Sequence, residues 1–275
     1  MLQEGVPAGR RGRDYTGSGA RSDVGAVRAA VRRGTGLISY RASPDDLFRG
    51  SRNPPLSTLQ LRAADGHSLS AYLVRPEGAP RGAVVVVQEI FGVNRHIRRV
   101  AEQYAAEGYL AIAPALFDRL AKDVDLGYDA AGLQAGIELM MKATNEGAIA
   151  DLDAAIAAVS HAGRVGMVGY CWGGRVTYVA GCRTRIAAGV AYYGGGIVQL
   201  LPETPRCPMM FHFGEHDSHI PAAEVERIRA AFPTGTYHLY PAGHGFNCTE
   251  RADFDARSAK LAFERSIEFF RHHVG

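Results

Sequence analysis

The stretch VGMVGYCWGG, residues 165–174, decides how this chain of 275 residues folds. Its first six residues are apolar, glycine or tyrosine, which is typical of a strand buried on both faces of a parallel sheet, and a helix is predicted from Trp172. The pattern G-x-C-x-G centred on Cys171 indicates a sharp turn that presents a nucleophile at the helix N-terminus, where the dipole favours a thiolate. A buried cysteine in a glycine-rich turn is the simpler alternative.

Strands and helices alternate on both sides of this turn. Residues 59–63 and 69–74 alternate between apolar and polar side chains, and Asp65-Gly66 between them predicts an antiparallel hairpin. The remaining pattern predicts an α/β fold, a doubly wound, mostly parallel sheet with helices on both faces. The other predicted strands are 83–88, 109–116, 165–170, 186–193, 209–213 and 236–240. One predicted helix runs from Asn94 to about Glu107, and a long helical stretch covers 130–160 with a break near 145–147. Further helices are predicted to start at Trp172 and at Pro221, and a final helix is predicted to end at His273.

The first 55 residues differ from the rest in composition. They are rich in Gly, Arg and Ser, and they hold ten Arg against five acidic residues. We predict a flexible extension over residues 1–55 and one catalytic domain over 56–275. The net charge of +3 arises in the extension, because the remainder carries 21 basic and 23 acidic side chains. A nearly neutral domain has no electrostatic footprint for nucleic acid, so we predict no such partner.

Several localisation signals are missing from the sequence. No apolar run approaches the ~20 residues that span a bilayer, and no apolar stretch follows the arginines of GRRGRD. We therefore predict a cytoplasmic protein without a membrane partner. The four cysteines form no C-x-x-C pair, and scattered cysteines in the cytosol are expected to be free thiols.

Two candidate partners of Cys171 follow later strands. Asp217 comes after the strand at 209–213, and His244 comes after the strand at 236–240. The carboxyl ends of parallel strands share one edge of a sheet, so the three side chains are predicted to meet there. Nucleophile, acid, histidine is the chain order of the α/β-hydrolase fold. We predict a triad in which His244 is the base and Asp217 orients it.

Simpler explanations exist for these residues, and a metal site is a further alternative. A loop aspartate often caps the following helix, and a histidine in a glycine-rich turn is often merely exposed. His212, His216, Asp217 and His219 crowd into eight residues. A His-x-x-x-His pair chelates well when both residues lie on one helix, whereas His212 is predicted in a strand and His216 in a loop. We therefore predict no metal and no cofactor.

Four motifs together resemble the dienelactone hydrolases, a family with the α/β-hydrolase fold. They are QEIFG at 88–92, GYCWGG at 169–174, G-x-x-D-x-x-x-P at 214–221 and AGHGF at 242–246, and the resemblance covers roughly residue 57 to the C-terminus. The resemblance implies that Cys171, Asp217 and His244 are the family's triad.

The resemblance also implies roles for other residues. Glu89 matches a glutamate that contacts the resting thiol and helps to deprotonate it, and a carboxylate directly after an apolar strand is costly to bury without a partner. Ile90 and Trp172 match the residues whose backbone N–H groups form the oxyanion hole. Tyr192 matches a tyrosine that lines the pocket, and we place Phe246 of AGHGF there as well.

The sequence departs from the family where the substrate carboxylate is bound. Characterised members hold that carboxylate with two arginines, and Leu133 and Cys248 stand at those two positions. Ile137 stands where a pocket tyrosine is expected. Arg251 and Arg119 are the candidate replacements. Without a replacement, the pocket lined by Leu133 and Ile137 is expected to favour neutral substrates, since burying an unpaired carboxylate costs several kcal/mol.

The predicted function is hydrolysis of a lactone or a small carboxylic ester through an acyl-enzyme, like that of a carboxymethylenebutenolidase. The substrate is a small molecule and no cofactor is required. A carboxylesterase for neutral or aromatic esters is one alternative. A thiol redox or binding protein of low turnover is the alternative from another functional class. The sequence makes no prediction of the oligomeric state.

Overall fold

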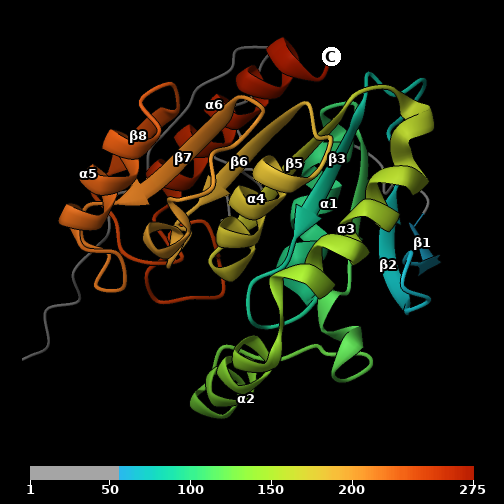
Figure 1. The fold of residues 1–275 in the computed structure, drawn as a ribbon, viewed down its shortest axis with the longest axis horizontal. Helices are drawn as coiled ribbons and strands as arrows, with labels where there is room; N and C mark the ends of the chain where they lie inside the picture. Colours follow the sequence, from blue (N-terminus) through green and yellow to red (C-terminus); the bar gives the residue numbers. More distant parts are fainter. Residues whose placement is uncertain (1–55) are drawn as a thin grey trace, which may run out of the picture. The chain divides into compact units, whose positions relative to one another are not determined.

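A computed structural model describes residues 56–275; the extension predicted over 1–55 lies outside the described residues. Eight strands form one sheet in the order β1-β2-β4-β3-β5-β6-β7-β8 (Figure 1). β1, β2 and β4 pair in antiparallel fashion, and the neighbours from β4 to β8 are parallel. This sheet confirms the predicted α/β-hydrolase fold. The elements are β1 (Leu56–Arg62), β2 (Ser68–Val74), β3 (Ala83–Val87), α1 (Arg95–Ala106), β4 (Leu110–Pro114), η2 (Leu116–Arg119), α2 (Ala130–Lys142), α3 (Asn145–Val159), η3 (Ser160–Ala162), β5 (Val165–Tyr170), α4 (Trp172–Arg183), β6 (Ala188–Tyr192), η4 (Ile197–Leu200), β7 (Met209–Gly214), α5 (Ala222–Ala231), β8 (Thr236–Tyr240) and α6 (Ala256–His273).

The central strand β3 explains why the sequence pattern there is continuously apolar. All five of its residues are fully buried. Val84 and Val86 belong to one core cluster, with residues of α1 and α6. Val85 and Val87 belong to a second cluster, with residues of α3. Because successive side chains point to opposite faces, a strand covered on both faces needs an apolar residue at every position.

Local capping residues set several helix boundaries. The Asn94 side chain accepts a hydrogen bond from the Ile97 N–H at 3.3 Å, which starts α1 where the sequence predicted. Thr144 accepts from the Gly147 N–H at 3.1 Å and starts α3. The predicted break in the long helical stretch is therefore the cap between α2 and α3. Helix α5 begins at Ala222, one residue after the predicted start, and Pro221 is its N-cap.

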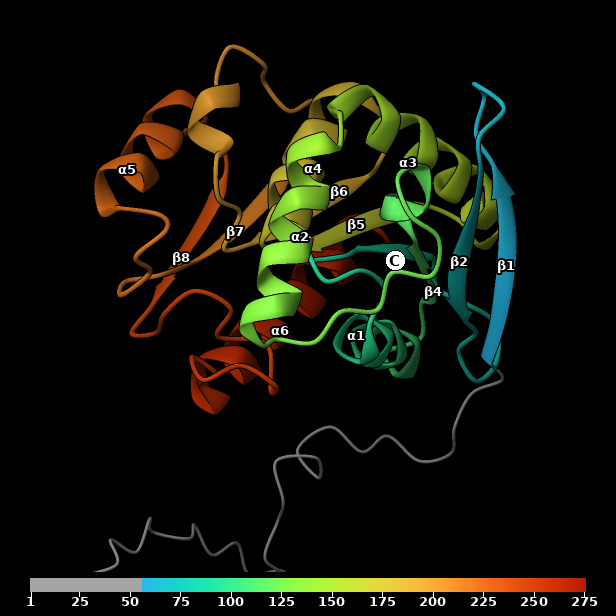
Figure 2. The ribbon, with the colours of Figure 1, turned by 90° about the horizontal axis from the view of Figure 1, so that it is seen from below.

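Helix α2 lies across the carboxyl ends of the strands (Figure 2). It packs closely on the loop after β3, because a Cβ atom at Gly136 would lie only 2.4 Å from the Ile90 carbonyl oxygen. The glycine therefore permits the helix and the loop to touch, which positions α2 over the edge where the predicted catalytic residues end their strands.

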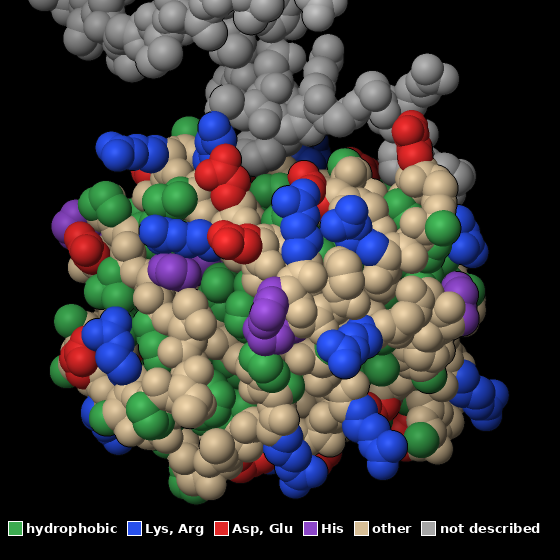
Figure 3. All heavy atoms as spheres, turned by 90° about the horizontal axis from the view of Figure 1, so that it is seen from above, with side chains coloured by type: hydrophobic (Ala, Val, Ile, Leu, Met, Phe, Trp, Pro, Cys, Tyr) green, Lys and Arg blue, Asp and Glu red, His purple; other side chains and the backbone are tan. Residues whose placement is uncertain are grey.

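The face opposite α2 carries basic and acidic side chains side by side (Figure 3). Charges of mixed sign do not build a large field of one sign. Within residues 56–275, no helix combines the length and the apolar character needed to cross a bilayer.

Candidate active site

The turn between β5 and α4 holds Cys171 in the backbone conformation φ 54°, ψ −119°. The Cys171 N–H donates to the Tyr192 carbonyl at 3.0 Å, which ties the turn to β6. Glycine is required on both sides of the cysteine. A Cβ at Gly169 would lie 2.0 Å from the Gly173 carbonyl oxygen, and one at Gly173 would lie 2.5 Å from the Val87 carbonyl oxygen. The close approach of these strands and α4 therefore produces the G-x-C-x-G pattern.

Cys171, His244 and Asp217 form a continuous hydrogen-bonded chain. The His244 Nε2 atom lies 3.1 Å from the Cys171 Sγ atom. On the other side of the ring, Nδ1 lies 2.8 Å from Oδ2 of Asp217. The second oxygen of Asp217 accepts from the His219 N–H at 2.8 Å. Asp217 is buried, and each of its carboxylate oxygens has a hydrogen-bond partner. These two bonds hold the carboxylate in one orientation toward the imidazole.

The electrostatic environment favours a charged His244. Burial lowers the pKa of His244, but the hydrogen bonds from its ring to Asp217 and to Cys171 outweigh burial and raise that pKa to about 10. The direction of this shift favours the imidazolium form of His244. The Cys171 side chain is partly exposed, so the thiol sulfur reaches a surface that a substrate can approach.

The two backbone N–H groups expected to bind an oxyanion are free of backbone acceptors in the described part of the chain. Trp172 is the first residue of α4, and amides in the first turn of a helix have no acceptor within that helix. The Ile90 N–H, in the loop after β3, donates no hydrogen bond within residues 56–275. The indole of Trp172 stacks on Phe117 with ring centroids 4.9 Å apart, which fixes the start of the helix.

Glu89 is fully buried directly after β3. Its Oε2 atom accepts a hydrogen bond from the Tyr128 hydroxyl at 3.1 Å, while its Oε1 atom has no partner within residues 56–275. Burial raises the pKa of Glu89, and the positive charge of Arg251 opposes the rise. In this structure the hydrogen-bond partner of the Cys171 thiol is His244, and the carboxylate of Glu89 is held by Tyr128.

Tyr193 is a site residue that sequence reasoning missed. It is fully buried, and its ring meets the His244 ring edge-on with centroids 5.1 Å apart. Its hydroxyl has no partner among the described residues. Burial raises the pKa of this hydroxyl, and the charges of Glu89 and Cys248 raise it further. The available signal was its position, because Tyr193 follows β6 at the same carboxyl edge that holds the triad.

The four predicted pocket residues occupy two different environments. Tyr192 and Phe246 are fully buried, and the Tyr192 hydroxyl is bonded to Ser266 at 2.8 Å. Both rings pack against each other behind the triad, with centroids 6.2 Å apart. Leu133 and Ile137 lie on α2, where Leu133 is 43% exposed and Ile137 is partly buried. The two residues on α2 are thus the ones of these four that keep exposed surface.

The two candidate arginines also differ. Arg119 is bound on two sides, by both oxygens of Asp151 at 2.8 Å and by Asp65 at 2.7 Å. The guanidinium group of Arg251 instead packs against Gly245, next to His244, with its Nε atom 2.7 Å from a Cβ built at that glycine. Burial lowers the pKa of Arg251, but the nearby Glu89 and Cys171 raise it overall. Arg251 is therefore the arginine whose charge acts on the site.

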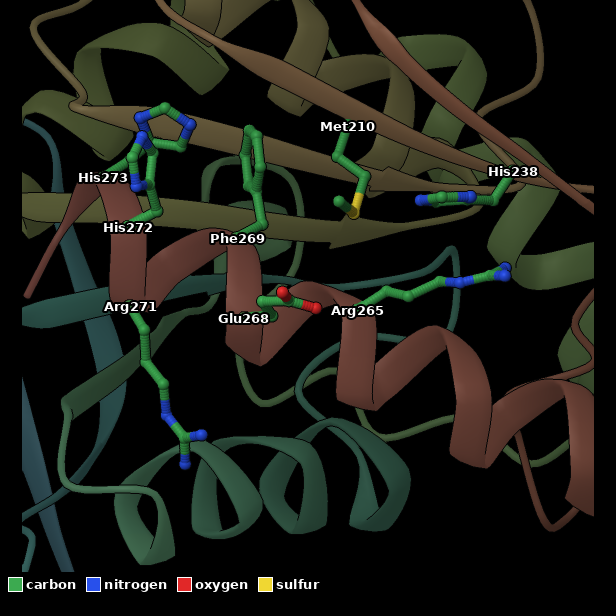
Figure 4. Close-up of a pocket in the computed structure, with 8 residues that line it drawn as sticks. All are labelled: Met210, His238, Arg265, Glu268, Phe269, Arg271, His272 and His273. Atoms are coloured by element: carbon green, nitrogen blue, oxygen red, sulfur yellow. The ribbon is translucent and has the colours of Figure 1, made fainter.

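Within residues 56–275, the ligating atoms of His212, His216, Asp217 and His219 do not gather into a metal-binding group, although the centroid of the His219 ring lies 4.9 Å from that of the His244 ring. His212 is buried in β7, where its ring bonds to the Tyr240 hydroxyl at 2.8 Å and to the Ser266 hydroxyl at 3.0 Å. A surface cleft of about 620 Å³ lies beyond it, between the sheet and α6. Figure 4 shows that Met210, His238 and Arg265 line this cleft, and none of the triad residues does.

Comparison with known proteins agrees with the fold and the motifs. Residues 69–274 match the model of the Dienelactone hydrolase family. Carboxymethylenebutenolidases from Pseudomonas putida and Pseudomonas knackmussii are each 33% identical over 222 residues, covering 77% of this chain and 94% of theirs. A solved structure of a dienelactone hydrolase-like promiscuous phosphotriesterase from metagenomic libraries has a TM-score of 0.64 at 19% identity, covers 80% of this chain and 99% of that chain, and shows the fold alone. The chain therefore belongs to the dienelactone hydrolase family of carboxylic ester hydrolases.

Proposed function

We propose that this protein hydrolyses lactones or small carboxylic esters with a Cys171–His244–Asp217 triad, through a thioester acyl-enzyme. The observation that carries the proposal is the hydrogen-bonded chain from the Asp217 carboxylate through both ring nitrogens of His244 to the Cys171 sulfur. This is the arrangement of a nucleophile, its base and an orienting carboxylate.

The acylation step uses a thiolate and a protonated imidazole. The Cys171 sulfur attacks the carbonyl carbon, and a C–S bond forms. The carbonyl oxygen becomes an oxyanion, which the N–H groups of Ile90 and Trp172 stabilise. The C–O bond to the leaving alkoxide then breaks, and the alkoxide takes the Nε2 proton of His244. In a lactone the leaving oxygen stays attached to the acyl group.

Deacylation returns the enzyme to its starting state. Neutral His244 accepts a proton from water, whose oxygen attacks the thioester carbonyl. The C–S bond breaks, the thiolate leaves, and the product is a carboxylic acid. Asp217 stabilises the imidazolium in both steps and holds the tautomer with the proton on Nδ1.

Glu89 is proposed to assist in forming the thiolate. The support is its burial, its raised pKa and its oxygen without a partner, since a protonatable carboxylate next to the site can take a proton when its surroundings change. The hydrogen bond from the Tyr128 hydroxyl holds the Glu89 carboxylate in its buried position.

Two alternatives remain separable by experiment. A carboxylesterase for neutral or aromatic esters would use the same triad and differ in substrate alone. A thiol redox or binding protein of low turnover would react with peroxide but would not turn over p-nitrophenyl acetate. The hydrogen-bonded base and the free oxyanion amides favour hydrolysis, because a redox thiol requires neither.

Replacing the nucleophile tests the triad directly. We expect Cys171→Ala to lower kcat for p-nitrophenyl acetate by roughly three orders of magnitude or more, as for other triads that lose their nucleophile. The matched control is Cys207→Ala, because the Cys207 thiol lies 3.9 Å from the Met209 sulfur, away from the triad, and should not affect the rate. Substantial hydrolysis by the Cys171 variant would refute the assignment.

Replacing the orienting acid tests the electrostatics. We expect Asp217→Asn to slow ester hydrolysis by about a hundredfold or more, because the amide favours the wrong His244 tautomer. The neighbouring Glu215→Gln is the control, since Glu215 is exposed. If Glu215→Gln proves the damaging change, the triad acid has been misplaced.

The Asp217→Asn variant is also expected to change how the stability of the protein depends on pH. The pKa of His244 is raised from 6.5 to about 10 in the folded state. The stabilisation that protonated His244 gives to the folded protein is therefore fully present below pH 6.5 and is lost as the pH rises through 10. Loss of the Asp217 hydrogen bond lowers that pKa. We therefore expect the difference in unfolding free energy between wild type and Asp217→Asn, measured in urea, to shrink as pH rises from 6.5 to 10. A difference that grows over this range contradicts the charge assignment.

Arg251 is proposed to set the charge of the preferred substrate. Its guanidinium group lies beside Gly245, which supports Arg251 over Arg119 as the replacement for the missing arginines. We expect wild type to favour a carboxylate-bearing dienelactone over its methyl ester in kcat/KM. Arg251→Gln should lower kcat/KM for the free acid alone, by about tenfold or more, and Arg251→Lys should retain part of the preference. Equal effects on acid and ester would show that Arg251 does not contact the carboxylate.

A further inference from the structure

Three buried side chains of metal-binding type converge next to the triad. They are Glu89, His96 and Cys248, and one ligating atom of each lies within 4.8 Å of those of the other two. Each is buried. The three come from separate parts of the chain, which are the loop after β3, the first turn of α1 and the loop after β8.

The backbone of each segment holds its side chain in this cluster. Asn94 caps α1 two residues before His96. The Cys248 N–H donates to the Gly245 carbonyl at 2.9 Å, so the thiol belongs to a tight turn that begins beside His244. The convergence is thus fixed by folded segments and does not depend on exposed, mobile side chains.

Two of these residues carry polar atoms that lack a partner. Oε1 of Glu89 and Nε2 of His96 are buried and have no hydrogen-bond partner within residues 56–275. A buried polar atom without a partner costs about 1–3 kcal/mol. Two such atoms on neighbouring side chains indicate that a ligand satisfies them together.

We propose that Glu89, His96 and Cys248 bind a divalent transition-metal ion of the zinc class. Three atoms no more than 4.8 Å apart share a point within about 2.8 Å of each of them, close to the bond lengths of about 2.0–2.3 Å for zinc. A carboxylate, an imidazole and a thiolate are a donor set that suits Zn²⁺ and is poorly matched to Mg²⁺ or Ca²⁺. Three protein ligands leave the fourth tetrahedral position for water or another small ligand.

The surroundings are compatible with a cation. Binding displaces protons from the Cys248 thiol and from Glu89, so the two ligands bring two negative charges to the ion. With the ion bound, Glu89 no longer takes the Cys171 proton, so the metal-bound form differs from the one proposed to start hydrolysis. Of the nearby arginines, Arg99 is paired with Glu250 at 3.2 Å. The positive charge of Arg251 acts on Glu89 and His96, and the two anionic ligands must offset it together with the charge of the ion. A small cavity of about 10 Å³, about the size needed for one water molecule, lies on the His96 side of the cluster and is also lined by Thr249.

Metal titration of the full chain tests the site. All measurements use the Cys171→Ala variant as the parent protein, because the Cys171–His244 pair is itself able to bind zinc. After treatment with a chelator and dialysis, the protein is titrated with Zn²⁺ by calorimetry and with Co²⁺ by absorption. We expect one equivalent of Co²⁺ to bind with a thiolate-to-cobalt charge-transfer band. Adding Cys248→Ser should abolish the band and weaken Zn²⁺ binding by about a hundredfold or more.

Two further variants keep the test decisive. Adding Cys207→Ser to the same background should change neither the band nor the affinity. Adding His96→Gln, which leaves Cys248 in place, should weaken Zn²⁺ binding by about tenfold or more even if the Cys248 variant fails to fold. Absence of the band in Cys171→Ala, or a band that survives Cys248→Ser, overturns the proposal. Because the readout is binding, its failure is distinguishable from a failure of the proposed hydrolysis.

Discussion

The arrangement of the site depends on the left-handed backbone conformation of Cys171, with φ 54°. A non-glycine residue in this region costs about 1–3 kcal/mol, so surrounding contacts must hold it. The bond from the Cys171 N–H to Tyr192 and the bond from the Gly174 N–H back to the Cys171 carbonyl, at 2.9 Å, provide that restraint. The turn places the sulfur within reach of His244 and turns the first amides of α4 toward the same space. Without this turn, the thiol and the backbone amides proposed to bind the oxyanion would not lie at one place.

A second constraint is electrostatic. The site buries an acid, Glu89, and a base, His244, and the positive charge of Arg251 acts on both Glu89 and Cys171. Both pKa values are raised, because burial favours the neutral form of Glu89 and the triad hydrogen bonds favour the charged form of His244. Both groups therefore hold a proton more tightly than they would in water, and shifted pKa values of this kind cluster at functional sites. The same burial leaves polar atoms unsatisfied beside the triad, which is where the metal-binding cluster lies.

Sequence patterns predicted the parts of this structure that depend on local rules. The strand at β5, the turn at Cys171, and the loops that carry Asp217 and His244 follow from apolar runs, glycines and the rule that parallel strands gather their carboxyl ends. The position of β4 between β2 and β3 was not predictable, because strand order depends on contacts between distant segments. The contact of Arg251 with Gly245 and the proximity of His96 to Cys248 were missed for the same reason. The first contact requires the loop after β8 to fold over His244, and the second requires the same loop to approach the start of α1. No periodicity in the sequence predicts the course of this loop.

The central claim is that Cys171 becomes acylated during turnover. Rapid quenching of wild type with an activated ester at low pH, followed by intact-mass and peptide mass spectrometry, measures it most directly. A triad of this geometry should give a protein heavier by one acyl group, with the group on the peptide that contains Cys171 and removable by hydroxylamine, as expected of a thioester. An acyl group found on another residue, or steady hydrolysis with no acylated protein even when deacylation is slowed, would contradict the account.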